Sequence, residues 1–426
     1  MTDRGSHLRS AGSPSAVRRS RVPTAEKLGL MAEAPPFAAD RLVTLANWQQ
    51  PPYNRWAFQH VRELIPSARI RRHGPAWRLP RDERDVTAIR FRAGGREMTV
   101  EQLLEHTWTD GFLVLHRGRI VTERYFNGMS PDTPHLLMSI SKSVTSTIVG
   151  VLVSRGALDV SSRVTDVVPG LTGTSFEGAT VQHLLDMRAG TKFDETYDDP
   201  EADVRVYEQV YLWRPRDGRP LPADALGYFV TLRNDGEHGG AFRYRSILSD
   251  VLAWVIERAT GSRLHELIAR ELWQPMGAEF DAEITVDAHG NPMADGGICA
   301  TLRDLGRFGQ LFLQGGRRGR REIVPSAWVD DTIGGAPDGA HAFVEGDDPP
   351  GYPRGAHYRN NWWVHDPTAP FFYAAGINGQ HVFVHGPSQT VVAKFSTWPV
   401  ALSPSLRHVT VRGVLAIADA FASAGV

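Results

Sequence analysis

The sequence contains little lysine and almost no cysteine. Of 47 basic residues only four are lysines, namely Lys27, Lys142, Lys192 and Lys394. Since arginine supplies nearly all the positive charge, a lysine inside an apolar pattern suggests a need for an amine that can lose its proton. The single cysteine excludes a disulfide framework, a zinc ribbon and a CxxC redox pair. We interpret Cys299, which follows Gly296-Gly-Ile, as a small buried hydrophobic residue.

The chain also lacks an excess of charge and a long apolar run. Its 47 basic and 48 acidic residues leave a net charge of −1, so neither nucleic acid nor an acidic membrane surface is an expected partner. No segment reaches the roughly 20 apolar residues of a membrane span. The arginines within residues 1–22 precede no apolar signal-peptide core. We therefore expect a cytoplasmic protein with a disordered basic tail over residues 1–40.

Several catalytic motifs are missing. The sequence has no Gly-Lys dipeptide, no HExxH and no GxSxG, which excludes a Walker-type phosphate loop, a zincin site and the nucleophile elbow of α/β-hydrolases. The 16 histidines show no ligand spacing with a nearby acid. We expect no metal and no cofactor.

Strand patterns occur near both ends of the folded part. Residues 112–116 and 120–126 read as one β-hairpin, and residues 381–385 and 390–396 read as another, followed by a helix over about 405–422. The signals between the hairpins are mostly helical. This order predicts an α/β (α+β) fold in which helices and an inserted all-α lobe flank a central antiparallel sheet.

Three helices are predicted in the middle of the chain. They cover residues 139–154, 181–187 and 249–259. The first has apolar residues at three- and four-residue spacings, and a glycine follows its end. We expect an α/β domain formed by residues 41–175 together with 295–426, and a mainly helical lobe formed by residues 176–294.

One of the rare lysines lies at the start of the first of these helices. Lys142 follows Ser139 by three residues, which places both side chains on one helix face. Serine becomes a nucleophile when a base removes its proton, and lysine can do so in its neutral form. Burial and the positive potential of a helix N-terminus both favour that form. The spacing indicates a serine nucleophile with a lysine base, although a solvated lysine near a helix start is the simpler alternative.

Two further elements follow along the chain. Tyr244 and Ser246 are two residues apart before a helix, so on an extended segment both side chains point the same way and can flank a nucleophile. Gly376-Ile-Asn-Gly-Gln380 leads into the late hairpin, where glycine allows the backbone to approach a substrate. Taken alone, the first is more typical of a helix-capping loop and the second of an ordinary turn.

In this order the three elements resemble the serine β-lactamase and penicillin-binding-protein superfamily, specifically its class C and esterase branch. Further segments are similar to the 6-aminohexanoate-dimer hydrolases, which degrade nylon oligomers and have carboxylesterase activity. These segments are Trp48–Trp56, Leu136–Lys142, Asp194–Pro200, Asp250–Arg258, Ile284–Asp287 and Gly376–Gln380. The resemblance covers about residues 45–420.

The resemblance implies a role for each matched catalytic position. Ser139 corresponds to the nucleophile and Lys142 to its general base. Tyr244 takes the position of the tyrosine that protonates the leaving group, and Ser246 supports this network. The backbone N–H groups of Ser139 and Ile377 correspond to the oxyanion hole.

The same resemblance implies substrate-binding positions. Tyr197 corresponds to a loop tyrosine that contacts the substrate amide nitrogen. Glu208 falls where the best amide hydrolases have an aspartate that binds the substrate amine, so the charge is retained with one more methylene. Trp362 and Trp363 are candidates for lining the acyl pocket, and Gly376 for close approach to the substrate.

One departure bears on the substrate. The third motif reads Ala374-Ala-Gly376 where β-lactamases have Lys-Thr-Gly, and thus lacks the cation that would hold a β-lactam carboxylate. We expect a serine hydrolase acting on small carboxylic esters, and on linear amides such as 6-aminohexanoate oligomers, through a Ser139 acyl-enzyme. A D-amino-acid peptidase or weak β-lactamase, and a binding protein that is acylated without turnover, are the alternatives. The expected partner is a small-molecule ester or amide, and a homodimer stays open.

Overall fold

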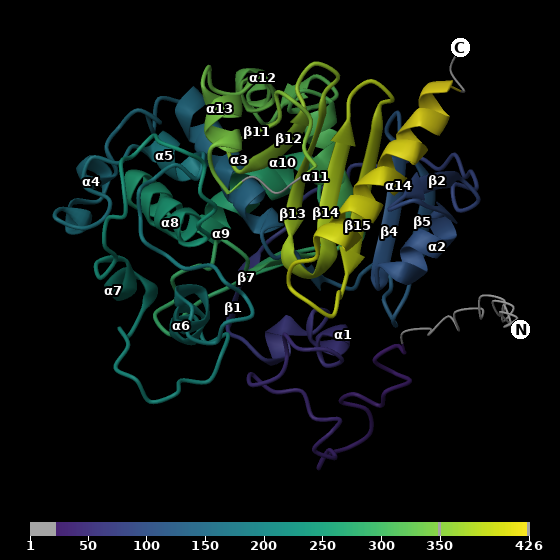
Figure 1. The fold of residues 1–426 in the computed structure, drawn as a ribbon, viewed down its shortest axis with the longest axis horizontal. Helices are drawn as coiled ribbons and strands as arrows, with labels where there is room; N and C mark the ends of the chain where they lie inside the picture. Colours follow the sequence, from purple (N-terminus) through teal and green to yellow (C-terminus); the bar gives the residue numbers. More distant parts are fainter. Residues whose placement is uncertain (1–22, 348–350, 424–426) are drawn as a thin grey trace, which may run out of the picture.

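A computed structural model describes residues 23–347 and 351–423 and places a seven-stranded antiparallel sheet at the centre (Figure 1). Its strand order is β11-β12-β13-β14-β15-β4-β5. The strands are β4 (Thr109–His116), β5 (Arg119–Tyr125), β11 (His357–Arg359), β12 (Trp362–Asp366), β13 (Phe371–Gly376), β14 (Gln380–His385) and β15 (Thr390–Ser396). Both predicted hairpins are present, and β15 pairs with β4, which joins the two ends of the chain. The predicted antiparallel α+β fold is confirmed.

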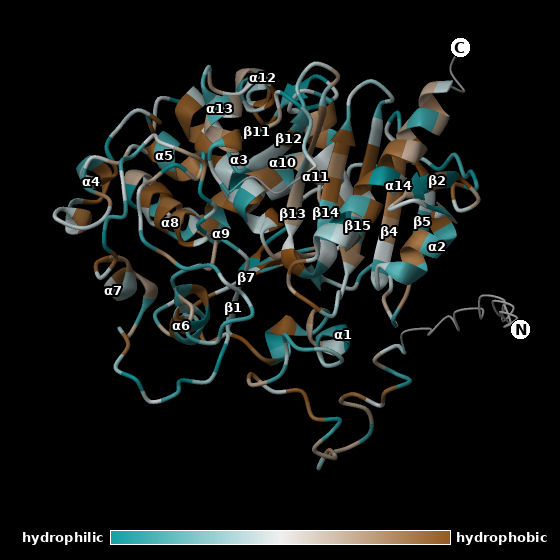
Figure 2. Cartoon of the chain, viewed as in Figure 1, coloured by the Kyte–Doolittle hydropathy of each residue, from teal (hydrophilic) through white to brown (hydrophobic). Residues whose placement is uncertain are grey.

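Helices cover both faces of this sheet. The helices α2 (Val100–His106) and α14 (Pro404–Ser423) pack on one face, and α3 (Ile140–Ser154) and α11 (Leu302–Leu313) pack on the other. Since successive side chains of a strand point to opposite faces, Val382 and Val384 of β14 join one apolar core whereas Phe383 joins the other. Strands buried on both sides therefore contain short continuous apolar runs, and Figure 2 shows brown segments along the central strands between white and teal ones.

The helical lobe lies beside the sheet, at the left of Figure 1. Residues 176–294 contain the helices α5 (Val181–Leu185), α6 (Asp203–Val210), α7 (Ala225–Phe229), α8 (Ile247–Thr260), α9 (Leu264–Leu267) and α10 (Gln274–Met276). The lobe is not purely helical, because it also contains the strand β7 (Ala282–Thr285). β7 belongs to a second sheet of order β1-β7-β8-β6, with β1 (Ser67–Ile70), β6 (His135–Leu136) and β8 (Ile298–Ala300). Strands of two to four residues carry too little alternation to be recognised in the sequence.

The remaining elements are short. They are the helices α1 (Asn54–Ala57), α4 (Val164–Val167), α12 (Ser326–Gly334) and α13 (Gly339–Val344), and the two-stranded pairs β2 (Arg90–Ala93) with β3 (Arg96–Thr99) and β9 (Arg317–Arg318) with β10 (Arg321–Glu322). Cys299 in β8 is buried, as expected of a core residue. Within the described residues no helix combines the length and the apolar character that a bilayer crossing requires.

The expectation of a disordered tail over residues 1–40 needs a correction. Residues 1–22 lie outside the described part, but residues from 23 onward form turns that pack on the body of the protein. Ala25 and Leu30 are buried, and the Ala25 N–H donates to Asn127 Oδ1 at 2.8 Å. The apolar residues of this stretch are too few to form a periodic pattern, yet they find partners in the tertiary structure.

Candidate active site

Ser139 occupies the N-cap of α3, where the chain turns sharply. The preceding residue, Met138, has a φ of 49°, a left-handed conformation that is unusual for a residue other than glycine. The end of β13 lies directly against this turn. A Cβ added at Gly376 would come within 2.6 Å of the Leu137 carbonyl oxygen and 3.0 Å of the Ser139 nitrogen. Only glycine lets the strand end approach the serine backbone this closely.

Lys142 contacts Ser139 directly. Its Nζ donates to Ser139 Oγ at 2.9 Å and to the Asp295 carbonyl oxygen at 2.8 Å. The side chain is buried, with 1% of the residue exposed. This lysine is thus held in one orientation beneath the serine, which rules out the alternative of a solvated lysine at a helix start.

Tyr244 closes the other side of the pair. Its phenol is hydrogen-bonded with Ser139 and Ser246, and its ring lies 5.2 Å from Lys142 Nζ. The ring also stacks on Trp363, with centroids 5.8 Å apart. Burial raises the pKa of the Tyr244 phenol and the Glu195 charge adds to that rise, whereas the hydrogen bond with Ser139 opposes it. The phenol therefore keeps its proton at neutral pH and can donate it.

Glu195 connects the remaining hydroxyl groups and was not predicted from the sequence. One carboxylate oxygen accepts the Ser246 N–H at 2.6 Å, and the other accepts from Ser246 Oγ and, at 2.5 Å, from the Tyr197 hydroxyl. Glu195 lies two residues before Tyr197, within the segment 194–200. No spacing rule links it to Ser246, 51 residues away, so only the tertiary structure reveals the contact.

Two backbone N–H groups face the same space. Ser139 is the N-cap of α3, and Ile377 is the first residue of η4 (Ile377–Gly379), a 3₁₀ turn between β13 and β14. Neither N–H donates a hydrogen bond to another group within residues 23–347 and 351–423. Free, converging N–H groups at a helix start can stabilise a developing oxyanion.

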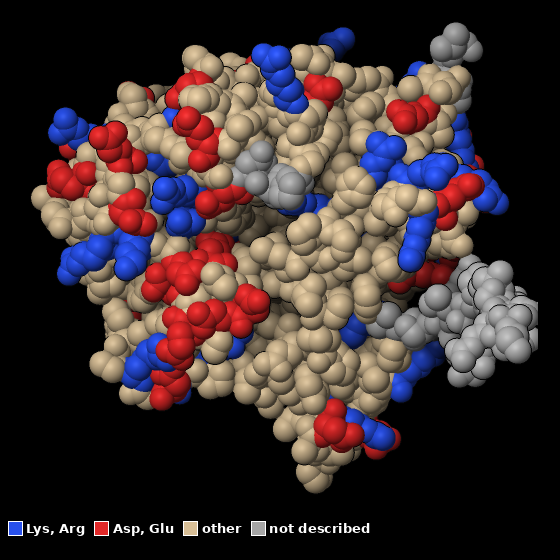
Figure 3. Space-filling view, in the orientation of Figure 1, with Lys and Arg blue, Asp and Glu red and all other residues tan. Residues whose placement is uncertain are grey.

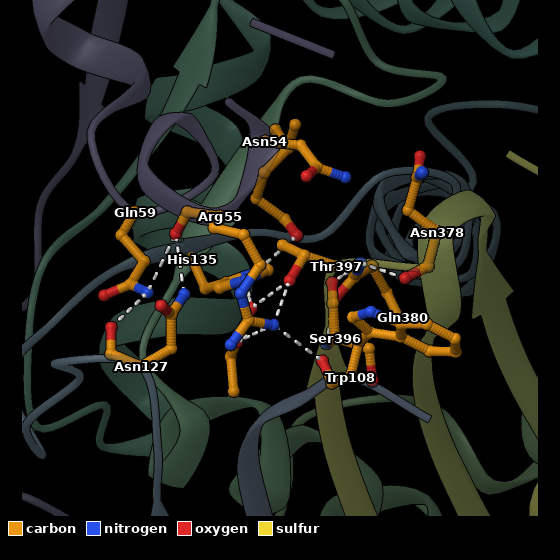
Figure 4. A network of polar contacts seen from close by, with 12 residues as sticks. Asn54, Arg55, Gln59, Trp108, Asn127, His135, Asn378, Gln380, Ser396 and Thr397 are labelled. Atoms are coloured by element: carbon orange, nitrogen blue, oxygen red, sulfur yellow. Dashed lines mark hydrogen bonds and ion pairs between the residues drawn. The ribbon is translucent and has the colours of Figure 1, made fainter. Parts of the chain in front are cut away.

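Buried amides hold the η4 turn in place. Gln380 Nε2 donates to the Ser396 carbonyl oxygen at 2.6 Å, and Gln380 Oε1 accepts the Ser396 N–H at 3.1 Å. Asn378, in a left-handed conformation with a φ of 57°, donates from Nδ2 to the Trp398 carbonyl oxygen at 2.9 Å. Figure 4 shows this network continuing through Thr397 to Arg55. The position of Ile377 is therefore fixed by the sheet behind it.

A cavity of about 450 Å³ opens in front of Ser139. Figure 3 shows the surface hollowed near the centre of the face drawn. Among the predicted residues, this cavity is lined by Ser139, Tyr197, Tyr244, Trp363, Gly376 and Ile377. The expectation for Trp362 needs a correction. Trp362 is fully buried and packs against Phe312 and Phe372, because alternate residues of β12 face opposite sides of the sheet.

A smaller recess of about 30 Å³ lies behind Ser139 and is lined by Tyr197, Glu208, Ser246 and Ile377 among others. Two arginines neutralise Glu208 there. Arg205 Nη1 lies 2.7 and 3.0 Å from its two carboxylate oxygens, and Arg214 Nε also contacts it. The carboxylate that the family resemblance assigned to a substrate amine is therefore occupied by protein cations.

Asp295 is the second carboxylate of the recess. Its backbone carbonyl binds Lys142, and its Oδ1 is buried without a hydrogen-bond partner among the described residues. Burial raises the pKa of the Asp295 carboxyl, and the Lys142 charge opposes that rise. Within the described chain no group of histidine, cysteine, aspartate and glutamate side chains is arranged to hold a metal ion.

The sequence matches a known protein family. The family model named Beta-lactamase matches residues 109–410. The chain belongs to this beta-lactamase family. It is also 38% identical over 375 residues to the 6-aminohexanoate-dimer hydrolase of Paenarthrobacter ureafaciens, covering 88% of this chain and 92% of that protein. The resemblance found in the sequence is confirmed, and the chain is a hydrolase.

Solved structures of other proteins share the fold. A Bacillus anthracis structure assigned as a 6-aminohexanoate-dimer hydrolase superposes with a TM-score of 0.82 at 26% identity, covering 89% of this chain and 97% of that one. EstCE1, a hydrolase with promiscuous acyltransferase activity, matches with a TM-score of 0.56 at 18% identity, covering 76% and 96%. The latter likeness concerns the fold alone.

Proposed function

We propose that this beta-lactamase-family hydrolase cleaves small carboxylic esters, and more slowly linear amides, through an acyl-enzyme on Ser139. The observation that carries the proposal is the contact of 2.9 Å between buried Lys142 and Ser139 at the floor of an open cavity. A lysine held there can take the serine proton as the hydroxyl attacks the substrate carbonyl.

The rest of the site supports the later steps. The N–H groups of Ser139 and Ile377 stabilise the oxyanion of the tetrahedral intermediate. Tyr244 donates its proton to the leaving alkoxide or amine, which departs into the larger cavity, because Tyr244 lines that cavity and not the recess. Water then attacks the acyl-enzyme and gives its proton to the Tyr244 phenolate, and Lys142 returns a proton to Ser139 Oγ as the acid leaves.

The recess favours a short, uncharged acyl group. Trp363 lines the larger cavity and not the recess, so in this proposal it faces the leaving group and not the acyl group. The recess is small, and Glu208 is paired with Arg205 and Arg214. An ammonium group on the acyl part would have to displace at least one of these pairs. We therefore propose esters of short neutral acids as the main substrates, and hydrolysis of 6-aminohexanoate oligomers as a weaker activity.

The test is hydrolysis of 4-nitrophenyl butyrate by the wild type and by Ser139→Ala. We expect the substitution to lower kcat/KM by about 1,000-fold or more. A fluorophosphonate should label the wild type and not the variant, with mass spectrometry placing the adduct on Ser139. Substantial turnover by Ser139→Ala would refute the proposal.

The alternatives give different results in the same assays. A D-amino-acid peptidase or weak β-lactamase would turn over D-alanyl peptides or nitrocefin faster than butyrate esters. A protein that is acylated without turnover would show a stable adduct on Ser139 and no released acid. The absence of a lysine in Ala374-Ala-Gly376 argues against the β-lactamase alternative, and the neutral phenol of Tyr244 argues against the second.

A further inference from the structure

Arg407 lines the large cavity from the first turns of α14. Its guanidinium lies 5.7 Å from the ring centroid of Tyr352, which lines the same cavity. In the part of the chain that the structure describes, no carboxylate lies within ion-pair distance of it. The helix itself gives no reason for a cation there, since its dipole disfavours positive charge near the N-terminus.

A second arginine in the cavity is paired with a carboxylate. Arg245 also lines the cavity, but its Nη1 lies 3.2 Å from an Asp347 oxygen and donates to the Tyr244 carbonyl at 2.8 Å. Its charge is thus used within the protein. The charge of Arg407 instead acts on a group that lines the cavity. Burial raises the pKa of Tyr373, and the Arg407 charge opposes that rise.

The charged residues that line the cavity come from different segments. Asp194 and Glu195 belong to the loop before α6, Arg245 and Asp347 form an ion pair, and Arg407 belongs to α14. Acidic side chains also gather beside α6 in Figure 3. An anion in the cavity would therefore be repelled by Asp194 and Glu195 and attracted to Arg407.

We infer that Arg407 forms an anion-binding subsite for the leaving group and selects esters and amides whose leaving group carries a carboxylate. This inference rests on the proposed function, because it takes the leaving group to depart past Tyr244 into the cavity that Arg407 lines. A planar guanidinium that no described carboxylate neutralises can bind a substrate carboxylate through two parallel hydrogen bonds. An ω-hydroxy or ω-amino acid is such a leaving group.

The test compares two substrates that differ only at the far end of the leaving group. These are the butyryl esters of 6-hydroxyhexanoate and of 6-hydroxyhexanamide. We expect the wild type to prefer the carboxylate ester by about fivefold to tenfold in kcat/KM, and this preference should fall as ionic strength rises. Arg407→Gln should abolish the preference by lowering the carboxylate ester selectively, and Arg407→Lys should retain part of it.

Arg412→Gln is the matched control. Arg412 belongs to the same helix as Arg407 but does not line the cavity. Arg412→Gln therefore changes the net charge as Arg407→Gln does, without changing the cavity. It should keep the wild-type preference. A wild type without preference, a preference that survives Arg407→Gln, or an equal loss for both esters in that variant would overturn the inference.

The outcome can be separated from a failure of the proposed function. If both esters are hydrolysed in a Ser139-dependent way without a preference, only the Arg407 subsite is refuted. If neither is hydrolysed, calorimetric binding of 6-hydroxyhexanoate to Ser139→Ala still tests the subsite. We then expect about fivefold to tenfold weaker binding when Arg407→Gln is added, and unchanged binding would refute the subsite.

Discussion

The described part of the chain contains two buried lysine–serine pairs, and only one of them includes a residue that lines the cavity. Lys142 contacts Ser139 at the start of α3, and Lys394 contacts Ser396 on β15. Both lysines are almost fully buried. Burial lowers the pKa of Lys394 to about 7, and the Asp110 charge opposes this fall. The second pair thus has a buried amine and a hydroxyl in contact, the same two groups that form the proposed catalytic pair.

The surroundings of the pairs explain the difference. Ser139 lines both the cavity and the recess and is hydrogen-bonded with Tyr244. Its backbone N–H and that of Ile377 donate to no group among the described residues. Neither Lys394 nor Ser396 lines either of these two spaces. The backbone of Ser396 instead exchanges two hydrogen bonds with the Gln380 side chain, which holds the η4 turn in place. A lysine next to a serine becomes a catalytic pair when a substrate can reach it and a transition state can be stabilised there.

Replacement of each lysine with methionine tests this difference between the two pairs most directly. Lys142→Met should lower kcat/KM for 4-nitrophenyl butyrate by about 1,000-fold or more, because no base then takes the Ser139 proton. Lys394→Met should change kcat/KM less than about tenfold, since it acts only through the packing behind the turn. Circular dichroism should show both variants folded. A comparable loss of activity in both variants would show that the two lysine–serine pairs do not differ in this way.

Replacement of Tyr244 should have the next largest effect. Tyr244→Phe retains the stacking on Trp363 but removes the proton donor. We expect about a 100-fold loss in kcat/KM for alkyl esters. The loss should be much smaller for 4-nitrophenyl esters, because 4-nitrophenolate leaves without protonation. Measurement of kcat/KM against leaving-group pKa checks this, and an equal loss across the series would contradict the assigned role.

Particular residues show which parts of the fold and of the candidate site the sequence alone could predict. Ser139 and Lys142 are three residues apart at the start of one helix, and Tyr244 and Ser246 are two apart, so local geometry predicts that the side chains of each pair share one side of their segment. The roles of these residues came from the order of the motifs and the family resemblance. The hairpins are recognisable because they are local as well. Glu195, Arg407 and the arginines that neutralise Glu208 meet their surroundings through the tertiary structure, where sequence spacing carries little information.

Stability as a function of pH should distinguish the two lysines further. Because the folded pKa of Lys394 is lowered to about 7, the unfolded chain binds more protons than the folded one between that pH and the ordinary lysine pKa. The free energy of unfolding should therefore rise with pH above about 7. Between pH 7 and 9 we expect the wild type to gain about 2 kcal/mol relative to Lys394→Met. Urea titrations that show the same pH dependence for both proteins would contradict this.

The smallest expected effect concerns Glu195, which joins the hydroxyl groups on the tyrosine side of the catalytic pair. Its oxygens accept hydrogen bonds from Ser246 and Tyr197. Glu195→Gln keeps the size of the side chain but removes a negative charge that raises the pKa of Tyr244. We expect about a tenfold loss in kcat/KM for alkyl esters, since one of the donors around the carboxylate loses its acceptor.

The pH profile separates this electrostatic role from simple packing. The Glu195 charge helps to keep the Tyr244 phenol protonated, so the alkaline limb of the pH profile of kcat/KM should move to lower pH in Glu195→Gln. Glu195→Asp retains the charge and should restore the wild-type position of this limb. A loss of activity with an unmoved limb would make Glu195 a structural residue only. The second lysine–serine pair offers the control, because Lys394 lines neither the cavity nor the recess. Lys394→Met should therefore leave the alkaline limb in its wild-type position.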